Sequence, residues 1–266
     1  MNTHSIRITE DGSTTIFNSM KNEHYHSTHG AVQESTHVFI AAGMSYLMDV
    51  EPQQAMGNTV NSSPHDHTIN ILEVGFGTGL NALLTLLELE KINKATEHHL
   101  HPLHINYTAL EPFPIDAEIV KKLNYCELLS VPELQETFEK MHFIFGQTNS
   151  SEPFLKSTQI TPHFNFTGGR STLQDYDPVS TNIAEKQHKY DLVYFDAFSP
   201  DTEPSLWTKE VFSKLYAIMN RGGVFVTYCS KGVVRRMMQE CGFKVERIKG
   251  PPGKHEMLRG NVALTP

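Results

Sequence analysis

The chain has 266 residues, 39% of them hydrophobic and 20% charged, which is an ordinary globular composition. The net charge of −8 predicts that the average surface repels nucleic acid and anionic membranes, although a local basic patch can override that average. No apolar run approaches the ~18 residues of a membrane span, so no membrane partner is expected, and three cysteines without a Cys-x-x-Cys pair disfavour a cysteine metal site.

The first part of the chain predicts a small extension. Alternating residues on either side of Asp11-Gly12 predict a β-hairpin at about 5–17, and a helix is expected over 36–48. The polar, turn-rich stretch 52–67 is predicted to be a loop. The N-terminus has no basic segment followed by an apolar core, and the cysteine usage suits a reducing compartment, so we expect a cytoplasmic location.

From Ile69 onward, short apolar runs alternate with helical patterns, and a polar excursion over 147–162 interrupts them. The predicted strands are 69–74, 104–110, 142–146, 163–169, 190–198, 223–229, 243–250 and 256–264. The predicted helices are 79–92, 115–123, 131–141, 204–220 and 232–242. The fourth of these helices is expected to stop at Arg221-Gly222-Gly223, and the fifth has a glycine C-cap signal.

Strands that alternate with helices predict an α/β fold with a doubly wound, mostly parallel sheet. Only a short loop joins the last two strands, so they are expected to pair antiparallel near the C-terminus. We expect 51–266 to form this Rossmann-like domain and 1–50 to form the hairpin and helix extension, the two packed as one compact unit.

Three glycines stand where the first parallel strand passes into its helix, in the sequence Glu-Val-Gly-Phe-Gly-Thr-Gly. Glycines there allow positive φ angles and close approach of the backbone to a ligand, and the helix offers free N–H groups. The G-x-G-x-G spacing differs from the G-x-G-x-x-G of dinucleotide sites and resembles motif I of the class I S-adenosylmethionine-dependent methyltransferases. This resemblance implies S-adenosyl-L-methionine as cofactor, bound by Glu73, Gly75, Phe76, Gly77, Thr78, Gly79 and Asn81.

A further acid, Glu111, ends the predicted strand 104–110. A carboxylate at this position accepts hydrogen bonds from both ribose hydroxyls, usually ~20 residues after the glycine turn. Glu111 follows Gly79 by 32 residues, and we attribute the excess to a longer helix–strand loop. Glu111 is therefore predicted to bind the cofactor ribose.

The loop after strand 163–169 is the least regular part of the predicted cofactor site. Many class I methyltransferases place an acid there to bind the adenine amino group, but this chain has Gly168-Gly169-Arg170 where Gly-Asp is expected. We assign the adenine contact to backbone groups of the same loop or to Asp175. The candidate cofactor residues are Gly169, Arg170 and Ser171.

Asp196 follows the apolar run of predicted strand 190–198, among the aromatic residues Tyr194, Phe195 and Phe198. This strand is expected beside the first one, so its end faces the reacting methyl group. Methyl transfer to an amine requires alignment of the nucleophile, exclusion of water and removal of one proton. Asp196 is therefore predicted to be catalytic, orienting an amine and accepting its proton, and to contact the cofactor.

Four separated segments resemble the methyltransferase domain of the bifunctional proteins that make 5-methylaminomethyl-2-thiouridine in tRNA: 23–43, 72–86, 193–212 and 223–258. In that family this domain uses S-adenosyl-L-methionine to convert the 5-aminomethyl group of wobble uridine into methylaminomethyl. An oxidoreductase domain with a flavin site first removes a carboxymethyl group. The resemblance therefore implies N-methylation of tRNA, with the anticodon stem-loop as partner. No oxidoreductase domain occurs in the sequence, so we expect a stand-alone methyltransferase that receives its substrate from the enzymes that install the aminomethyl group.

The first and last of these segments also supply candidate substrate-binding residues. The alternative for the first segment is a helix cap, and for the last a solvated hairpin loop. Together with the aromatic residue after Asp196, the candidates implied by the resemblance are His26, Ser27, Glu34, Phe198, Lys254 and Glu256.

Residues 221–260 contain nine Lys and Arg but three Glu, which predicts a phosphate-binding face on an otherwise acidic protein. Bases of the anticodon loop are expected to stack on aromatic or Arg side chains. The histidine-rich stretches 65–67 and 97–101 lie in predicted loops and lack a second ligand cluster, so no metal site is expected.

Two other functions remain open. A class I methyltransferase acting on a small-molecule amine would also suit an Asp among aromatic residues. A non-catalytic tRNA-binding protein that retains the fold is disfavoured by the intact set of Glu73, Glu111 and Asp196 together with the glycine turn. A nicotinamide oxidoreductase is disfavoured by the glycine spacing.

Overall fold

The computed structural model describes residues 4–49, 67–95, 102–147, 155–178 and 189–264. The predicted loop 52–67 and the histidine-rich stretches lie almost entirely outside these residues. No helix within the described part of the chain is both long and apolar enough to cross a membrane.

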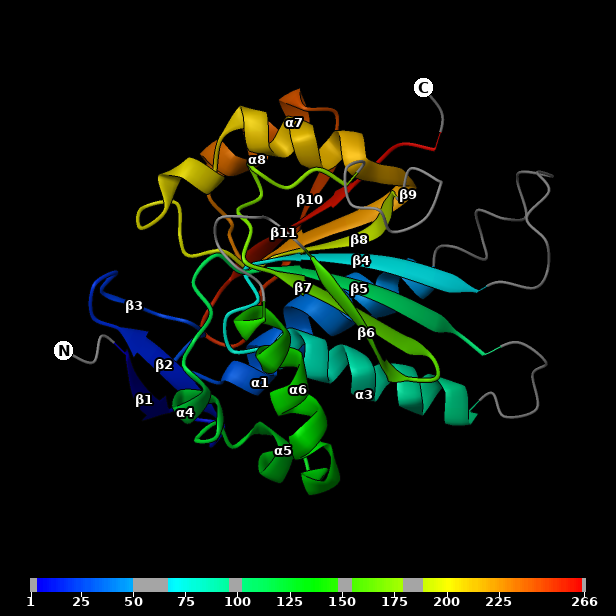
Figure 1. Ribbon diagram of the computed structural model, residues 1–266. Coiled ribbons are helices and arrows are strands. Elements are labelled where there is room, and N and C mark those ends of the chain that lie inside the picture. The colour runs from blue at the N-terminus through cyan, green and yellow to red at the C-terminus, as the bar shows by residue number, and fades with distance from the viewer. Residues whose placement is uncertain (1–3, 50–66, 96–101, 148–154, 179–188, 265–266) are drawn as a thin grey trace.

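The predicted N-terminal hairpin is confirmed, and a short third strand extends it into a small antiparallel sheet in the order β1-β2-β3. Its strands are β1 (His4–Ile8), β2 (Thr14–Asn18) and β3 (Glu23–His24). The turn forms because Asp11 accepts hydrogen bonds from Thr9 and Ser13, while Gly12 adopts a φ of 83°. This sheet lies beside one end of the larger sheet (Figure 1).

The main sheet is doubly wound and mostly parallel, as the alternation of strands and helices predicts. Its strands are β4 (Thr68–Val74), β5 (His104–Leu110), β6 (Lys156–Thr161), β7 (Phe164–Gly169), β8 (Tyr190–Phe195), β9 (Met219–Thr227), β10 (Lys244–Lys249) and β11 (Glu256–Asn261). They lie in the order β10-β11-β9-β8-β4-β5-β7-β6. β4, β5, β7, β8 and β9 are parallel, whereas β10 and β11 pair antiparallel, as predicted, and β6 pairs antiparallel with β7.

Helices cover both faces of this sheet (Figure 1). Below it in the view lie α1 (Ala31–Ser35), α3 (Leu80–Ala95), α4 (Ala117–Val120), α5 (Tyr125–Leu128) and α6 (Gln135–Gly146). The π-helix η1 (Thr36–Ser45) continues α1, and the short 3₁₀ turn η2 (Pro132–Leu134) precedes α6. Above the sheet lie α7 (Lys209–Ile218) and α8 (Gly232–Glu240), with the 3₁₀ turn η3 (Pro204–Leu206) before α7.

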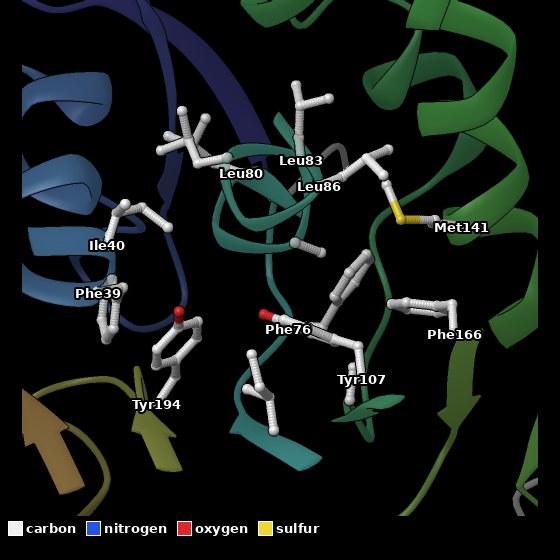
Figure 2. Packing of buried hydrophobic residues seen from close by; sticks show 14 of the residues in the cluster. Phe39, Ile40, Phe76, Leu80, Leu83, Leu86, Tyr107, Met141, Phe166 and Tyr194 are labelled. Atoms are coloured by element: carbon white, nitrogen blue, oxygen red, sulfur yellow. The ribbon is translucent and has the colours of Figure 1, made fainter. Parts of the chain in front are cut away.

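Each face of the sheet has its own hydrophobic core. In β8, Tyr194 contributes to the core below the sheet, whereas Val193 and Phe195 contribute to the core above it. This two-sided burial explains why the strand reads as an unbroken apolar run. Figure 2 shows part of the lower core, with side chains from η1, α3, α6, the sheet and the turn between β4 and α3: Phe39, Ile40, Phe76, Leu80, Leu83, Leu86, Tyr107, Met141, Phe166 and Tyr194.

Two predicted strand assignments need correction. The predicted strand 142–146 is wrong, because these residues form the last turns of α6. Phe138, Met141 and Phe145 are buried at helical spacing, while Phe143 is 65% exposed, so the short apolar run follows a period of 3.6. The polar excursion predicted over 147–162 contains a strand that was not predicted, β6. It is an edge strand, and its polar, partly exposed residues show no apolar pattern.

The boundary between α7 and β9 also differs from the prediction. The helix ends at Ile218, and β9 already begins at Met219. Gly222 and Gly223 therefore lie inside the strand, where its pairing with β8 shifts register. The shift accommodates the two glycines as an irregularity of the strand, so they mark a bulge and not the end of the helix.

Candidate functional site

A cavity of about 930 Å³ opens at the carboxyl ends of the central parallel strands. Its wall includes Gly75 after β4, Glu111 after β5 and Asp196 after β8. β4 lies between β5 and β8, so this is the point at which the strand order reverses. Open α/β sheets bind ligands at this position. The three strand ends that the sequence singles out therefore meet at one cavity.

The glycine turn between β4 and α3 is folded tightly against the neighbouring strand ends. Gly75 and Gly77 have φ angles of 90° and 52°. The N–H of Gly75 donates to the carbonyl of Leu110 at 3.0 Å. A Cβ atom on Gly75 would lie 2.5 Å from the carbonyl oxygen of Asp196, so no side chain fits at this position.

Replacing Gly75 with Ala is therefore expected to destabilise the fold. Positive φ at a non-glycine residue costs about 1–3 kcal/mol, and the clash with backbone adds to this. Thermal or urea unfolding measures the change. Gly146→Ala is the matched control, because nothing lies within 4 Å of a Cβ atom at that position. Equal stability of the two variants would contradict the proposed close packing of the turn.

Glu111 is held by the glycine turn itself. Its Oε2 accepts a hydrogen bond from the N–H of Gly77 at 3.0 Å, and its Oε1 accepts one from the N–H of Phe113 at 2.9 Å. Burial raises the pKa of Glu111, while these two backbone hydrogen bonds oppose the rise. The carboxylate is fixed at the cavity wall, and each oxygen keeps a lone pair for a further donor.

Asp196 is linked to a second carboxylate beneath the cavity. The side-chain amide of Asn81 donates to Oδ2 of Asp196 at 2.8 Å and to Oε1 of Glu73 at 2.9 Å. Glu73 is fully buried, and burial raises its pKa well above the usual range, with the charge of Asp196 adding to the rise. Asn81 thus fixes the position of Asp196 relative to the end of β4.

Asp196 itself faces the cavity. Burial, followed by repulsion from Glu34, raises the pKa of Asp196 to about 7, although the hydrogen bond from Asn81 opposes the rise. A carboxyl group with this pKa exchanges a proton near neutral pH. Carboxyl groups with perturbed pKa values in a cleft are frequent at functional sites. The position of Asp196 on the cavity wall and its raised pKa therefore both indicate a functional residue.

The small N-terminal sheet and the segment after it form one wall of the cavity. The ring of Tyr25 covers the glycine turn, because a Cβ atom on Gly77 would lie 3.0 Å from it. His26 shares a hydrogen bond of 2.6 Å with the hydroxyl of Thr78. Burial lowers the pKa of His26 to about 4, so the imidazole is neutral at pH 7.

The loop after β8 is tied to the same N-terminal sheet. Glu23 accepts hydrogen bonds from the N–H of Ser199 at 3.1 Å and from its hydroxyl at 2.9 Å. Phe198 packs edge-to-face on Tyr25, with 5.1 Å between ring centroids. Lys21 lies 5.0 Å from the centroid of Phe198 and 3.4 Å from Glu203. These contacts fix the loop that follows Asp196.

An ion pair between a buried carboxylate and a partly exposed lysine completes the cavity wall. Nζ of Lys254 lies 2.7 Å from Oε1 of Glu34 and 4.0 Å from the ring centroid of Tyr228. Ser27 donates its backbone N–H to the other oxygen of Glu34 at 2.7 Å. Glu34, Ser27 and Lys254 are far apart in sequence from Asp196, yet all four line this cavity.

Not every predicted site residue reaches the cavity. Among the described residues that line it, the predicted candidates are His26, Ser27, Glu34, Gly75, Gly77, Glu111, Ser171, Asp196, Phe198 and Lys254. The remaining candidates lie behind the wall or beside it: Glu73, Phe76, Thr78, Gly79, Asn81, Gly169, Arg170 and Glu256.

The candidates that do not line the cavity make contacts elsewhere, and these contacts differ from residue to residue. Phe76 packs against Phe145 in the lower core, with 4.7 Å between ring centroids. Arg170 directs its Nε to the carbonyl of Phe145, away from the cavity. Glu256 pairs with Arg247 at 3.1 Å. Asp175 is bound to the hydroxyl of Thr172 and is exposed, whereas Thr172 itself lines the cavity.

The sequence reasoning missed many wall residues, and Glu23, Tyr25 and Tyr228 are the ones with polar or aromatic contacts described above. Tyr228 follows β9 directly, so it could have been found by asking which side chain stands after each parallel strand. Glu23 and Tyr25 reach the wall only because the N-terminal sheet packs against this end of the main sheet, and no local pattern in the sequence predicts that packing.

The basic segment 221–260 is less positive in the fold than in the sequence. Lys254 pairs with Glu34, and Lys231 pairs with Asp201, so two acids from outside the segment offset its charge. Arg259 pairs with Glu246 at 2.9 Å and also stacks on Tyr46. The local excess of positive charge is therefore smaller than the residue count indicates.

Comparison with known proteins gives three kinds of match. Residues 151–263 match a family model described as S-adenosyl-L-methionine-dependent methyltransferase. The tRNA 5-methylaminomethyl-2-thiouridine biosynthesis bifunctional protein MnmC of Burkholderia mallei (strain NCTC 10229) is 27% identical over 264 residues, which cover 96% of this chain and 35% of that protein. The same protein of Burkholderia pseudomallei (strain 668) is 28% identical and is covered to 34%. The chain thus spans about a third of the length of these curated relatives.

A solved structure supports the fold. The crystal structure of MnmC2 from Aquifex aeolicus superposes with a TM-score of 0.65 at 23% sequence identity. The match covers 98% of this chain and 70% of that one. The predicted fold, a doubly wound and mostly parallel α/β sheet with an N-terminal β-hairpin extension, is therefore confirmed.

Proposed function

We propose that this chain, an S-adenosyl-L-methionine-dependent methyltransferase homologous to the methyltransferase region of the MnmC proteins, methylates the 5-aminomethyl group of wobble uridine in tRNA. The product of the reaction on the thiolated base is 5-methylaminomethyl-2-thiouridine. The observation that carries the proposal is the position of Asp196, a carboxyl group with a pKa raised to about 7 on the wall of the cavity beside the glycine turn.

The residues of the crevice fit the cofactor. At Gly75 and Gly77 a Cβ atom would collide with the backbone of Asp196 or the ring of Tyr25, so the turn presents bare backbone to the cavity. Glu111 offers free lone pairs for ribose hydroxyls. Of the described residues that line the cavity, five carry carboxylates and two are lysines, so the cavity suits a cationic donor. S-adenosyl-L-methionine supplies an activated methyl group on a positively charged sulfur.

Adenine contacts are assigned to the loop after β7. Ser171, Thr172 and Leu173 line the cavity there, and Leu173 is an apolar side chain in a position to pack on a flat ring. The missing Gly-Asp pair is therefore replaced by backbone groups and Ser171. Glu73 and Asn81 act indirectly, by holding Asp196, because their side chains lie behind the wall.

The chemical role of Asp196 follows from its surroundings. A primary amine attacks a methyl group only after it has lost a proton, so that its lone pair is free. Asp196 orients the amine and takes this proton. His26 lines the same cavity, but its pKa of about 4 makes its imidazole a much weaker proton acceptor than the carboxylate. Tyr25 covers the glycine turn, Phe198 packs on Tyr25, and together they limit access of water.

The direct test is incubation of tRNA that carries 5-aminomethyl-2-thiouridine with methyl-labelled S-adenosyl-L-methionine, followed by nucleoside mass spectrometry. The label is expected in 5-methylaminomethyl-2-thiouridine. Treating the acceptor pool with RNase beforehand should remove the activity. Label that persists in a small amine after RNase treatment would contradict the tRNA assignment and favour the small-molecule alternative. The proposal also implies a preceding enzyme that installs the aminomethyl group.

The pH dependence of transfer tests the role of Asp196 separately. Its raised pKa means that the carboxyl is protonated, and unable to accept a proton, below about pH 7. The rate should therefore rise with pH through about 7. In Asn81→Ala, which removes a hydrogen bond that lowers the pKa of Asp196, the rise should move to higher pH. A profile that is the same in both proteins would assign the titration to another group.

A further inference from the structure

A lysine ammonium already occupies a cation site inside the cavity. Nζ of Lys254 lies 2.7 Å from a carboxylate oxygen of Glu34 and 4.0 Å from the centroid of the Tyr228 ring. A carboxylate on one side and an aromatic face on another is the arrangement that binds alkylammonium groups. The segments that supply this arrangement, α1, the residue after β9 and the β10–β11 loop, converge at the cavity.

Both walls of this cation site are held in place without help from Lys254. Glu34 accepts the N–H of Ser27 at 2.7 Å through its second oxygen, and its side chain is only 8% exposed. Tyr228 donates its hydroxyl to the carbonyl of Ala197 at 2.8 Å, which fixes the plane of its ring. The site is therefore preformed, and removing the lysine side chain would leave the carboxylate and the ring where they are.

Lys254 is the movable member of the group. Its side chain is 35% exposed and sits on a flexible four-carbon stem in the loop between β10 and β11. A buried carboxylate without a cation partner is costly, so an internal ammonium keeps Glu34 paired while the cavity holds no other cation. An incoming ammonium could replace it with no change in the charge of the site.

The cation site lies next to the proton acceptor. Ala197, which anchors Tyr228, follows Asp196 directly in the chain, and Glu34, Tyr228, Lys254 and Asp196 line the same cavity. An ammonium bound to Glu34 and Tyr228 would therefore be presented beside the carboxylate that removes its proton. The side chain of Lys254 ends in the same chemical group, a primary ammonium on a methylene carbon, as an aminomethyl substrate.

We propose that Glu34 and Tyr228 form the subsite for the primary alkylammonium group of the substrate, and that Lys254 fills this subsite as an internal stand-in until the substrate displaces it. The identity of the substrate amine rests on the proposed function. In this arrangement the cavity selects a cationic aminomethyl group, and Lys254 competes with it for Glu34 and Tyr228.

Direct binding measurements test the competition without any methyl transfer. The protein saturated with S-adenosylhomocysteine is titrated with 5-aminomethyluridine, and 5-hydroxymethyluridine serves as the neutral control ligand. Lys254→Met should bind 5-aminomethyluridine about tenfold more tightly than wild type, since the competitor is gone. Adding Glu34→Gln to Lys254→Met should abolish this gain. Neither change should affect the neutral ligand.

The matched control variant is Lys91→Met, which removes an exposed lysine on α3 whose partner is Glu88. It should bind both nucleosides as wild type does, and circular dichroism checks that each variant is folded. Unchanged or weaker binding of 5-aminomethyluridine by Lys254→Met, or no binding by any of these proteins, would overturn the stand-in role. Failure of the wild-type protein to methylate tRNA would instead contradict the proposed function, which this titration does not measure.

Discussion

Asp196→Ala is expected to abolish methyl transfer while leaving the affinity for S-adenosyl-L-methionine within a few fold. Asp196 is the carboxylate on the cavity wall with a pKa near 7, and loss of a general base costs about 10²- to 10⁴-fold in rate. Cofactor affinity should survive because the glycine turn and Glu111 do not depend on this side chain. Single-turnover transfer and isothermal titration measure the two quantities.

Asp196→Asn is the closer control. It keeps the size of the side chain and an oxygen that accepts the hydrogen bond from Asn81, but it cannot take a proton from an amine. Both variants should therefore be inactive and folded. If Asp196→Asn turns over at near the wild-type rate, proton transfer to this residue is excluded.

Glu111→Ala should weaken binding of S-adenosyl-L-methionine by about 1–3 kcal/mol, or roughly 5- to 150-fold, through loss of charge-assisted hydrogen bonds. The carboxylate is held at the end of β5 by the N–H groups of Gly77 and Phe113, and its remaining lone pairs face the cavity. Isothermal titration provides the dissociation constant.

Glu111 also accepts a hydrogen bond from the N–H of Gly77 in the glycine turn. Glu111→Ala could therefore weaken cofactor binding by disturbing the turn, without any contact between Glu111 and the ribose. S-adenosylhomocysteine and its 2′,3′-dideoxy analogue separate these effects. Wild type should prefer the form with both hydroxyls, and Glu111→Ala should lose that preference. A variant that discriminates between the two ligands as wild type does would reject the ribose assignment.

Much of the fold could be read from local sequence because the central parallel strands, β8 above all, are buried on both faces. Continuous apolar runs such as β8, with helical patterns between them, leave few alternatives to a doubly wound sheet. The same reasoning located the site, since the carboxyl ends of β4, β5 and β8 must meet at one edge. The prediction of a strand at 142–146 was wrong because a run of only five residues is too short for its apolar spacing to distinguish a strand from the end of a helix.

The parts of the site that the sequence did not reveal depend on long-range docking. Glu34 and Lys254 are 220 residues apart, and their ion pair forms only because the β10–β11 loop reaches α1. Glu23 and Tyr25 join the wall through the N-terminal sheet, which is tied to the loop after β8 by Ser199. The charge counted along the basic segment 221–260 overestimated its positive excess for the same reason, since Asp201 and Glu34, which pair with two of its lysines, come from other segments.

A crystal structure with bound S-adenosylhomocysteine would most directly test where the methyl donor sits. The ribose hydroxyls should lie against Glu111, the amino-acid portion should follow the glycine turn at Gly75 and Gly77, and the sulfur should face the side of the cavity that holds Asp196. A ligand found at another place, or side chains that fill the crevice and exclude it, would contradict the account.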